Sequence, residues 1–107
     1  MNNRRRIETR EGFDIYFTPE SEDMTAREHF IDECGWTEKQ FDKIRNYDFF
    51  CAHVEAERAG IVLGEAYLGC CCELQFRDFW EREGDYFDSM VDEAITAAKQ
   101  KLEELNR

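Results

Sequence analysis

The spacing of the apolar residues changes along this chain, and that change restricts the fold more than any other feature. Over residues 47–57 apolar side chains alternate with polar ones, which is typical of a half-buried strand; the apolar members are Phe50, Ala52, Val54 and Ala56. Over residues 87–105 apolar side chains recur at helical spacing. The chain is therefore expected to combine a sheet with a helix.

Shorter patterns predict the remaining elements. Residues 12–18 alternate ahead of Pro19 and predict a strand. Two capping boxes, Thr25 with Glu28 and Thr37 with Gln40, predict two short helices, the first ending near Cys34. Residues 58–60 predict a turn, and residues 61–72 a returning strand in which two glycines mark bulges or close packing: Gly64 and Gly69.

These elements predict an α+β fold in the order β-α-α-β-β-α. We expect a small three-stranded antiparallel sheet with helices packed on one face, and a long C-terminal amphipathic helix that Gly84 breaks or kinks. The chain of 107 residues, 42% of them hydrophobic, can bury a single core. The expected organisation is a basic N-terminal arm at residues 1–11 and one domain at residues 12–107.

The charge is strongly acidic and unevenly distributed. The chain holds 25 Asp and Glu against 14 Lys and Arg, a net charge of −11. Residues 11–98 contain 22 of the acids but only seven of the bases, which gives that part −15. Because self-repulsion on this scale destabilises a compact domain, a function that uses the charge deserves weight.

The candidate partner-binding residues are carboxylates in two rows. The first row has sequence spacings of four, three and four, which place its members on one face of a helix. Neighbouring Cβ atoms on such a face are roughly 5–6 Å apart, a distance comparable in scale to that between phosphates along a nucleic-acid strand. It consists of Glu81, Asp85, Asp88 and Asp92. The second row, on the predicted hairpin, consists of Glu55, Glu57 and Glu65. The rows are interpreted either as a surrogate for a nucleic-acid backbone or as ordinary solvated surfaces.

Cysteines offer a possible metal site. Residues 70–72 are three adjacent cysteines, and Cys51 and His53 lie on the expected partner strand. Consecutive strand residues point to opposite faces, so at most Cys70 and Cys72 converge, and buried cysteine commonly packs as a small apolar group. We therefore expect structural packing, no metal and no cofactor; a zinc centre at Cys51, His53, Cys70 and Cys72 and a reactive thiol are the alternatives.

No pattern predicts catalysis. His29 or His53 would need a nucleophile or carboxylate beside it and a third orienting group, and no glycine-rich phosphate-binding motif is present. We expect a protein that is not an enzyme.

An apolar span and a secretory signal are both lacking and the cysteine count is odd, which predicts a cytoplasmic location in a host cell. The arginines at residues 4–6 are expected to form a mobile or self-docked tail without binding nucleic acid directly.

From Trp36 onward, residues 60–72 (GIVLGEAYLGCCC) and residues 85–94 (DYFDSMVDEA) resemble small proteins carried by proteobacterial genomes, phages and plasmids. Small acidic proteins of mobile elements resemble the anti-defence class, which includes anti-CRISPR and anti-restriction proteins that act as DNA mimics. The resemblance implies a non-catalytic inhibitor that binds a basic nucleic-acid-binding site of a host CRISPR effector or restriction enzyme. The alternative is a regulatory module, antitoxin-like or accessory, that dimerises through residues 87–105; monomer and homodimer both stay open.

Overall fold

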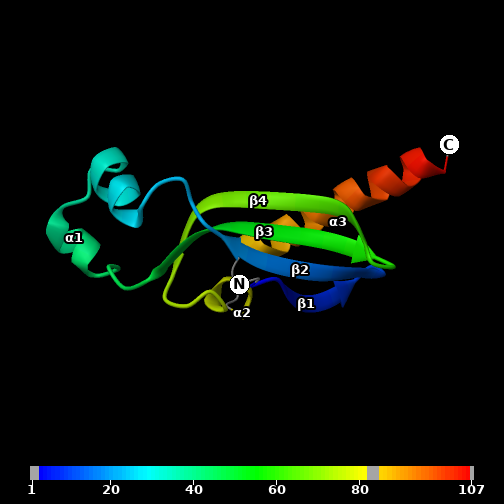
Figure 1. Ribbon diagram of the computed structural model, residues 1–107, viewed down its shortest axis with the longest axis horizontal. Coiled ribbons are helices and arrows are strands. Elements are labelled where there is room, and N and C mark those ends of the chain that lie inside the picture. The colour runs from blue at the N-terminus through cyan, green and yellow to red at the C-terminus, as the bar shows by residue number, and fades with distance from the viewer. Residues whose placement is uncertain (1–2, 82–84, 107) are drawn as a thin grey trace.

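A computed structural model describes residues 3–81 and 85–106, with the backbone alone for residue 85 (Figure 1). The elements in chain order are β1 (Arg5–Arg10), β2 (Phe13–Glu20), η1 (Glu28–Glu33), α1 (Glu38–Asp42), β3 (Asp48–Arg58), β4 (Ile61–Glu73), α2 (Asp78–Glu81) and α3 (Asp85–Leu105). The expected α+β class is confirmed, since one antiparallel sheet packs against the long helix α3.

The prediction of three strands is wrong, because the sheet has four in the order β1-β2-β3-β4. The additional edge strand β1 comes from the segment expected to be a basic arm. It is joined to β2 by a two-residue turn in which Glu11 and Gly12 both have positive φ, 54° and 81°. A turn of this geometry matches the twist of a hairpin, so Arg10 is held opposite Phe13.

The core lies between the sheet and α3. On β2 the buried side chains alternate as Phe13, Ile15 and Phe17, and on α3 the apolar stripe is buried. The backbone of α3 packs directly on Gly64 of β4, where an added Cβ would lie only 2.0 Å from the carbonyl oxygen of Ala94. The glycine is therefore required by direct packing of the helix backbone on the strand, which confirms the close packing predicted for it.

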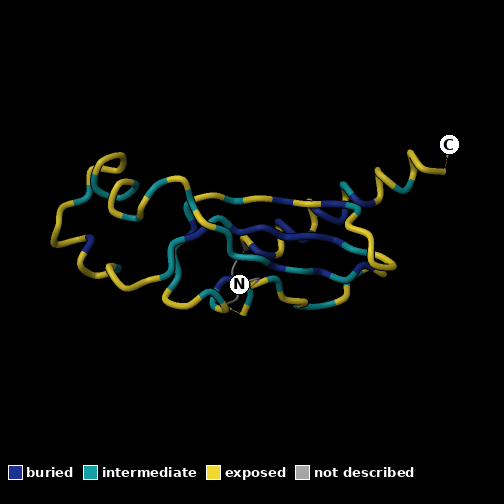
Figure 2. Tube along the Cα trace, viewed as in Figure 1, coloured by how far each residue is buried: buried dark blue, intermediate teal, exposed yellow. Residues whose placement is uncertain are grey.

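The segment that contains η1 and α1 projects from one end of the sheet and is mostly exposed (Figures 1 and 2). Both capping boxes are present: Glu28 N–H donates to Thr25 Oγ1, and Gln40 N–H donates to Thr37 Oγ1. The first helix differs from the prediction, because residues 28–33 form a π-helix in place of an α-helix reaching Cys34. The predicted break at Gly84 lies outside the described residues.

The face of the sheet opposite α3 is open. Within residues 3–81 and 85–106, no helix is laid across it (Figure 1). Its side chains come from alternate positions of the strands and include the cross-strand pairs Tyr16–Glu55 and His53–Tyr67. No helix in the described part of the chain has the length and apolar character needed to cross a membrane.

Candidate acidic surfaces

Helix α3 presents the most exposed of the predicted carboxylates. The side chains of Asp88 and Asp92 are 67% and 72% exposed and lie one helical turn apart. Both contact one arginine of β1: Arg10 Nη2 lies 3.0 Å from Asp88 Oδ1, and Arg10 Nη1 lies 3.7 Å from Asp92 Oδ1. The sequence predicted the carboxylates at this place, although it did not predict that a strand would bring Arg10 beside them.

Arg10 is shared by three carboxylates, because its Nη2 also lies 2.9 Å from Glu8 Oε1. The hydrogen bond to Asp88 is the main cause that raises the pKa of the guanidinium above its ordinary value. One positive charge among three negative charges leaves this cluster at −2. The edge strand therefore neutralises the acidic surface of α3 only in part.

The other two members of the first row do not continue the same helix. Glu81 is the last residue of the short helix α2 and lies 4.0 Å from Arg77. Asp85 is the first residue of α3, and its side chain is outside the described residues. The structure therefore brings together Asp88 and Asp92, and it places Glu81 on a separate element.

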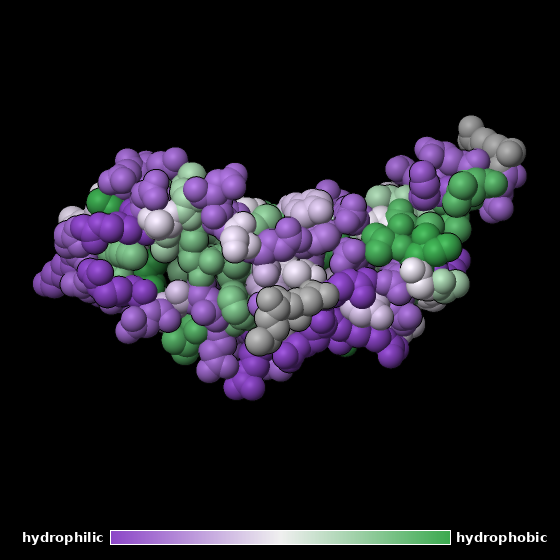
Figure 3. Space-filling model, viewed as in Figure 1, coloured by the Kyte–Doolittle hydropathy of each residue, from purple (hydrophilic) through white to green (hydrophobic). Residues whose placement is uncertain are grey.

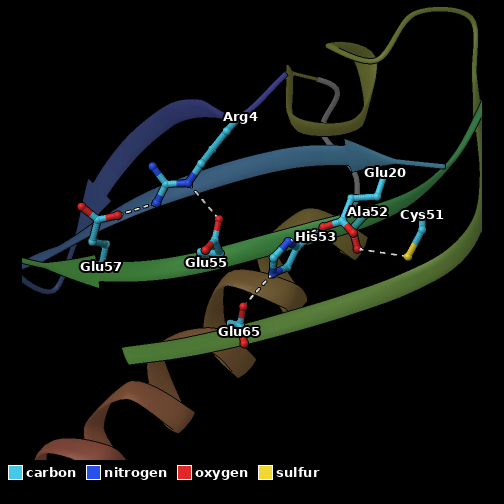
Figure 4. Close-up of polar contacts among 8 residues, drawn as sticks. All are labelled: Arg4, Glu20, Cys51, Ala52, His53, Glu55, Glu57 and Glu65. Carbon is cyan, nitrogen blue, oxygen red and sulfur yellow. Dashed lines mark hydrogen bonds and ion pairs between the residues drawn. The ribbon is translucent and has the colours of Figure 1, made fainter. Parts of the chain in front are cut away.

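The second row is recessed beneath an arginine on the open face of the sheet. Arg4 contacts both Glu55, at 3.0 Å, and Glu57 (Figure 4). Its guanidinium also lies over the ring of Tyr16, 3.6 Å from the ring centroid. Burial by itself lowers the pKa of Arg4, but the hydrogen bonds to Glu57 and Glu55 outweigh this effect and raise it. Both carboxylates are largely covered. They contribute less to an exposed polyanion than the sequence predicted.

The third member of this row, Glu65, belongs to a histidine cluster. Its Oε1 lies 3.0 Å from His53 Nε2, while Glu20 Oε2 lies 2.5 Å from His53 Nδ1 (Figure 4). The ring of Tyr67 stacks on the imidazole at 4.2 Å, with the two planes 7° apart. His53 is thus held between two carboxylates from neighbouring strands, a pairing that depends on strand register and was missed in the sequence.

The cysteines do not converge on a common centre. A bulge at Cys70, with φ of 56°, directs Cys71 to the core beside Phe50, while Cys72 pairs with Phe49. Burial raises the pKa of the Cys71 thiol to about 11. Within the described residues, the group of three or more potential ligands close enough for one ion contains His53, Glu55 and Glu65, and no cysteine.

A hollow of about 450 Å³ lies beside the start of β1. Its lining includes Arg5, Arg77, Asp48 and the aromatic rings of Phe76 and Trp80. The guanidinium of Arg5 lies 5.7 Å from the ring centroid of Trp80. Arg4, which also lines the hollow, contacts Glu55 and Glu57, so the hollow adjoins the second carboxylate row.

Comparison with known proteins gives no match. No family model, no curated protein and no solved structure matches the chain. The resemblance to mobile-element proteins noted in the sequence stays a prediction.

Proposed function

We propose that this protein is a non-catalytic acidic inhibitor that occupies a basic nucleic-acid-binding site of a host defence complex and blocks DNA or RNA from it. The observation that carries the proposal is the α3 surface, where Asp88 and Asp92 keep most of their area in solvent and Arg10 is outnumbered by carboxylates. A basic groove that ordinarily binds phosphates attracts such a surface, and the attraction weakens as salt screens it.

Under this proposal, the most exposed carboxylates meet the partner first. Asp88 and Asp92 project from the exposed side of a helix whose backbone packs directly on Gly64 of β4. Glu55 and Glu57 are covered by Arg4, so they add to the long-range field without direct contact. The contact surface is therefore α3, with Glu93 beside it as a further exposed carboxylate.

The function is tested in a bacterial host that carries an active CRISPR or restriction system. Expression of the parent protein should raise the plaquing efficiency of a targeted phage, and a variant with Asp88→Asn and Asp92→Asn should lose most of this effect. A matched control, Asp23→Asn with Asp32→Asn, removes the same charge from the projecting segment and should keep it. Failure of the parent to protect phage from any nucleic-acid-targeting defence would contradict the proposal.

A second candidate, the dimeric regulatory module, is favoured by one observation. The C-terminal turns of α3 extend past the end of the sheet at which β4 begins (Figure 1). Leu105, the last residue of α3, is 64% exposed, and Ile61, the first residue of β4, is 61% exposed. Figure 3 shows apolar surface gathered there. Sedimentation equilibrium of the parent and of Leu105→Glu distinguishes the candidates: a concentration-dependent dimer that the variant abolishes supports the module, and a monomer up to near-millimolar concentration rejects it.

A further inference from the structure

We propose that His53, Glu55 and Glu65 bind one divalent transition-metal ion on the open face of the sheet. The three residues come from the neighbouring strands β3 and β4, and one ligand atom of each lies within 4.8 Å of the others. This inference goes beyond the proposed function, because it concerns the face of the sheet opposite the α3 surface.

The distance between the first two ligand atoms already suits a metal ion. Ligands about 2.1 Å from an ion, at right angles or at the tetrahedral angle, lie about 3.0–3.4 Å from each other. His53 Nε2 and Glu65 Oε1 are 3.0 Å apart. Glu55, whose carboxylate is held by Arg4 at 3.0 Å, completes the set through a side-chain movement.

Glu20 orients the imidazole as metal-binding proteins orient theirs. Its carboxylate oxygen Oε2 lies 2.5 Å from Nδ1, in position to accept a hydrogen bond from a protonated Nδ1. When the ring proton is on Nδ1 alone, the Nε2 lone pair faces Glu65 Oε1 at 3.0 Å, and a cation between these two atoms removes their repulsion. A carboxylate on the far nitrogen is the usual second partner of a ligating histidine.

The local charge favours a cation as well. Glu55 and Glu57 lie beside Arg4, and Glu20 and Glu65 lie beside His53. These four carboxylates and one guanidinium leave −3 when His53 is neutral. His53 and Glu55 are only 8% and 9% exposed, so part of this charge is removed from water. Desolvated like charges repel strongly, and a divalent ion would offset most of them.

The donor atoms define the class of ion. One imidazole nitrogen with carboxylate oxygens suits zinc or manganese, whereas calcium and magnesium prefer sites made of oxygen alone. The stacked ring of Tyr67 fixes the plane of the imidazole and covers one side of it. The site is therefore expected to select Zn²⁺ over Mg²⁺.

Isothermal titration of the EDTA-treated full chain with ZnCl₂ tests the proposal, with MgCl₂ as the comparison. We expect saturable one-to-one binding of Zn²⁺ that Glu65→Gln weakens at least tenfold and Glu20→Gln weakens about 10- to 100-fold, the range for an outer partner of a ligating histidine. Glu65 is about half exposed, so its variant should fold. The matched control Glu93→Gln changes an exposed carboxylate of α3 and should bind as the parent does.

Because the five cysteines can also bind zinc, a second probe is needed. Mn²⁺, which thiolates bind poorly, should selectively broaden the NMR signals of His53 and Glu65. Absence of saturable zinc binding would overturn the proposal, as would binding that is equal in the parent and in Glu65→Gln. Two persistent ring N–H protons on His53 in the presence of excess Zn²⁺ would show that a proton, and not a metal ion, lies between the residues.

Discussion

Arg10 on the edge strand β1 and Asp88 on helix α3 are 78 residues apart in the chain, and a 3.0 Å hydrogen bond joins them. The contact joins the edge strand β1 to α3, the helix that covers one face of the sheet. It also places one positive charge beside the carboxylates proposed to bind a partner. The pair is therefore expected to stabilise the fold and, at the same time, to weaken the attraction of this surface for a basic partner.

Replacing Arg10 with Ala should leave the fold intact and strengthen binding to a polycation. The ion pairs are partly exposed, so their loss should cost under about 1 kcal/mol of unfolding free energy. Fluorescence anisotropy with labelled polylysine should show a lower Kd than for the parent. Arg45→Ala removes one charge from the projecting segment and is the control; an equal gain there would show that only net charge matters.

Gly64→Ala should be severely destabilising, because the new Cβ would meet the backbone of α3 at Ala94 and at Ala98, 2.6 Å away. Overpacking of this kind costs about 1–3 kcal/mol and more where backbone must move. Gly69→Ala on the same strand meets only the flexible carboxylate of Glu22 at 3.4 Å, so it should cost much less. Urea denaturation of both variants gives the comparison, and equal midpoints would refute the packing described for β4.

Deleting residues 1–10 should destabilise the domain, since β1 is part of the sheet. The deletion removes Ile7 from the edge of the core and several backbone hydrogen bonds, on the order of 3 kcal/mol in all. Deleting residues 1–3 should have little effect. Thermal melts followed by circular dichroism measure both; a long deletion that melts with the parent would mean that the arm is not needed for the fold.

Cys71 should be the slowest cysteine to react with iodoacetamide at pH 8. Burial raises the pKa of its thiol to about 11, so the reactive thiolate is scarce at that pH in the folded state. This burial contributes stability that is complete below the ordinary thiol pKa of about 8.5 and is lost as the pH rises through about 11. Timed alkylation with peptide mass spectrometry provides the test, with exposed Cys34 as the fast reference; early labelling of Cys71 would contradict its burial.

Sequence periodicity predicts three of the four strands and the long helix because their apolar residues repeat along one face. Strand β1 has only Ile7 as an aliphatic residue in a run of arginines, so it lacks that pattern. Its pairing depends on the Glu11–Gly12 turn and on cross-layer contacts such as Arg10 with Asp88. The glycine of that turn was the one available signal for a hairpin.

The histidine cluster could not be predicted because it depends on register. Counting back from the turn at residues 59–60, Arg58 opposes Ile61 and Glu57 opposes Val62, which would place Glu55 opposite Gly64. A register shift between Ala56 and Glu57 instead places Glu55 opposite Glu65. One extra residue thus moves Glu65 to the face that holds His53, since a slip of one reverses every side chain.

The central claim is that the α3 surface takes the place of nucleic acid on a basic partner. Affinity capture from host lysate on the immobilised parent, eluted with duplex DNA, tests this claim most directly. The account predicts that nucleic-acid-binding proteins are retained at low salt and displaced by DNA, that Asp88→Asn with Asp92→Asn loses them, and that Asp23→Asn with Asp32→Asn keeps them. Retention that DNA does not displace, or that is equal in both double variants, would contradict it.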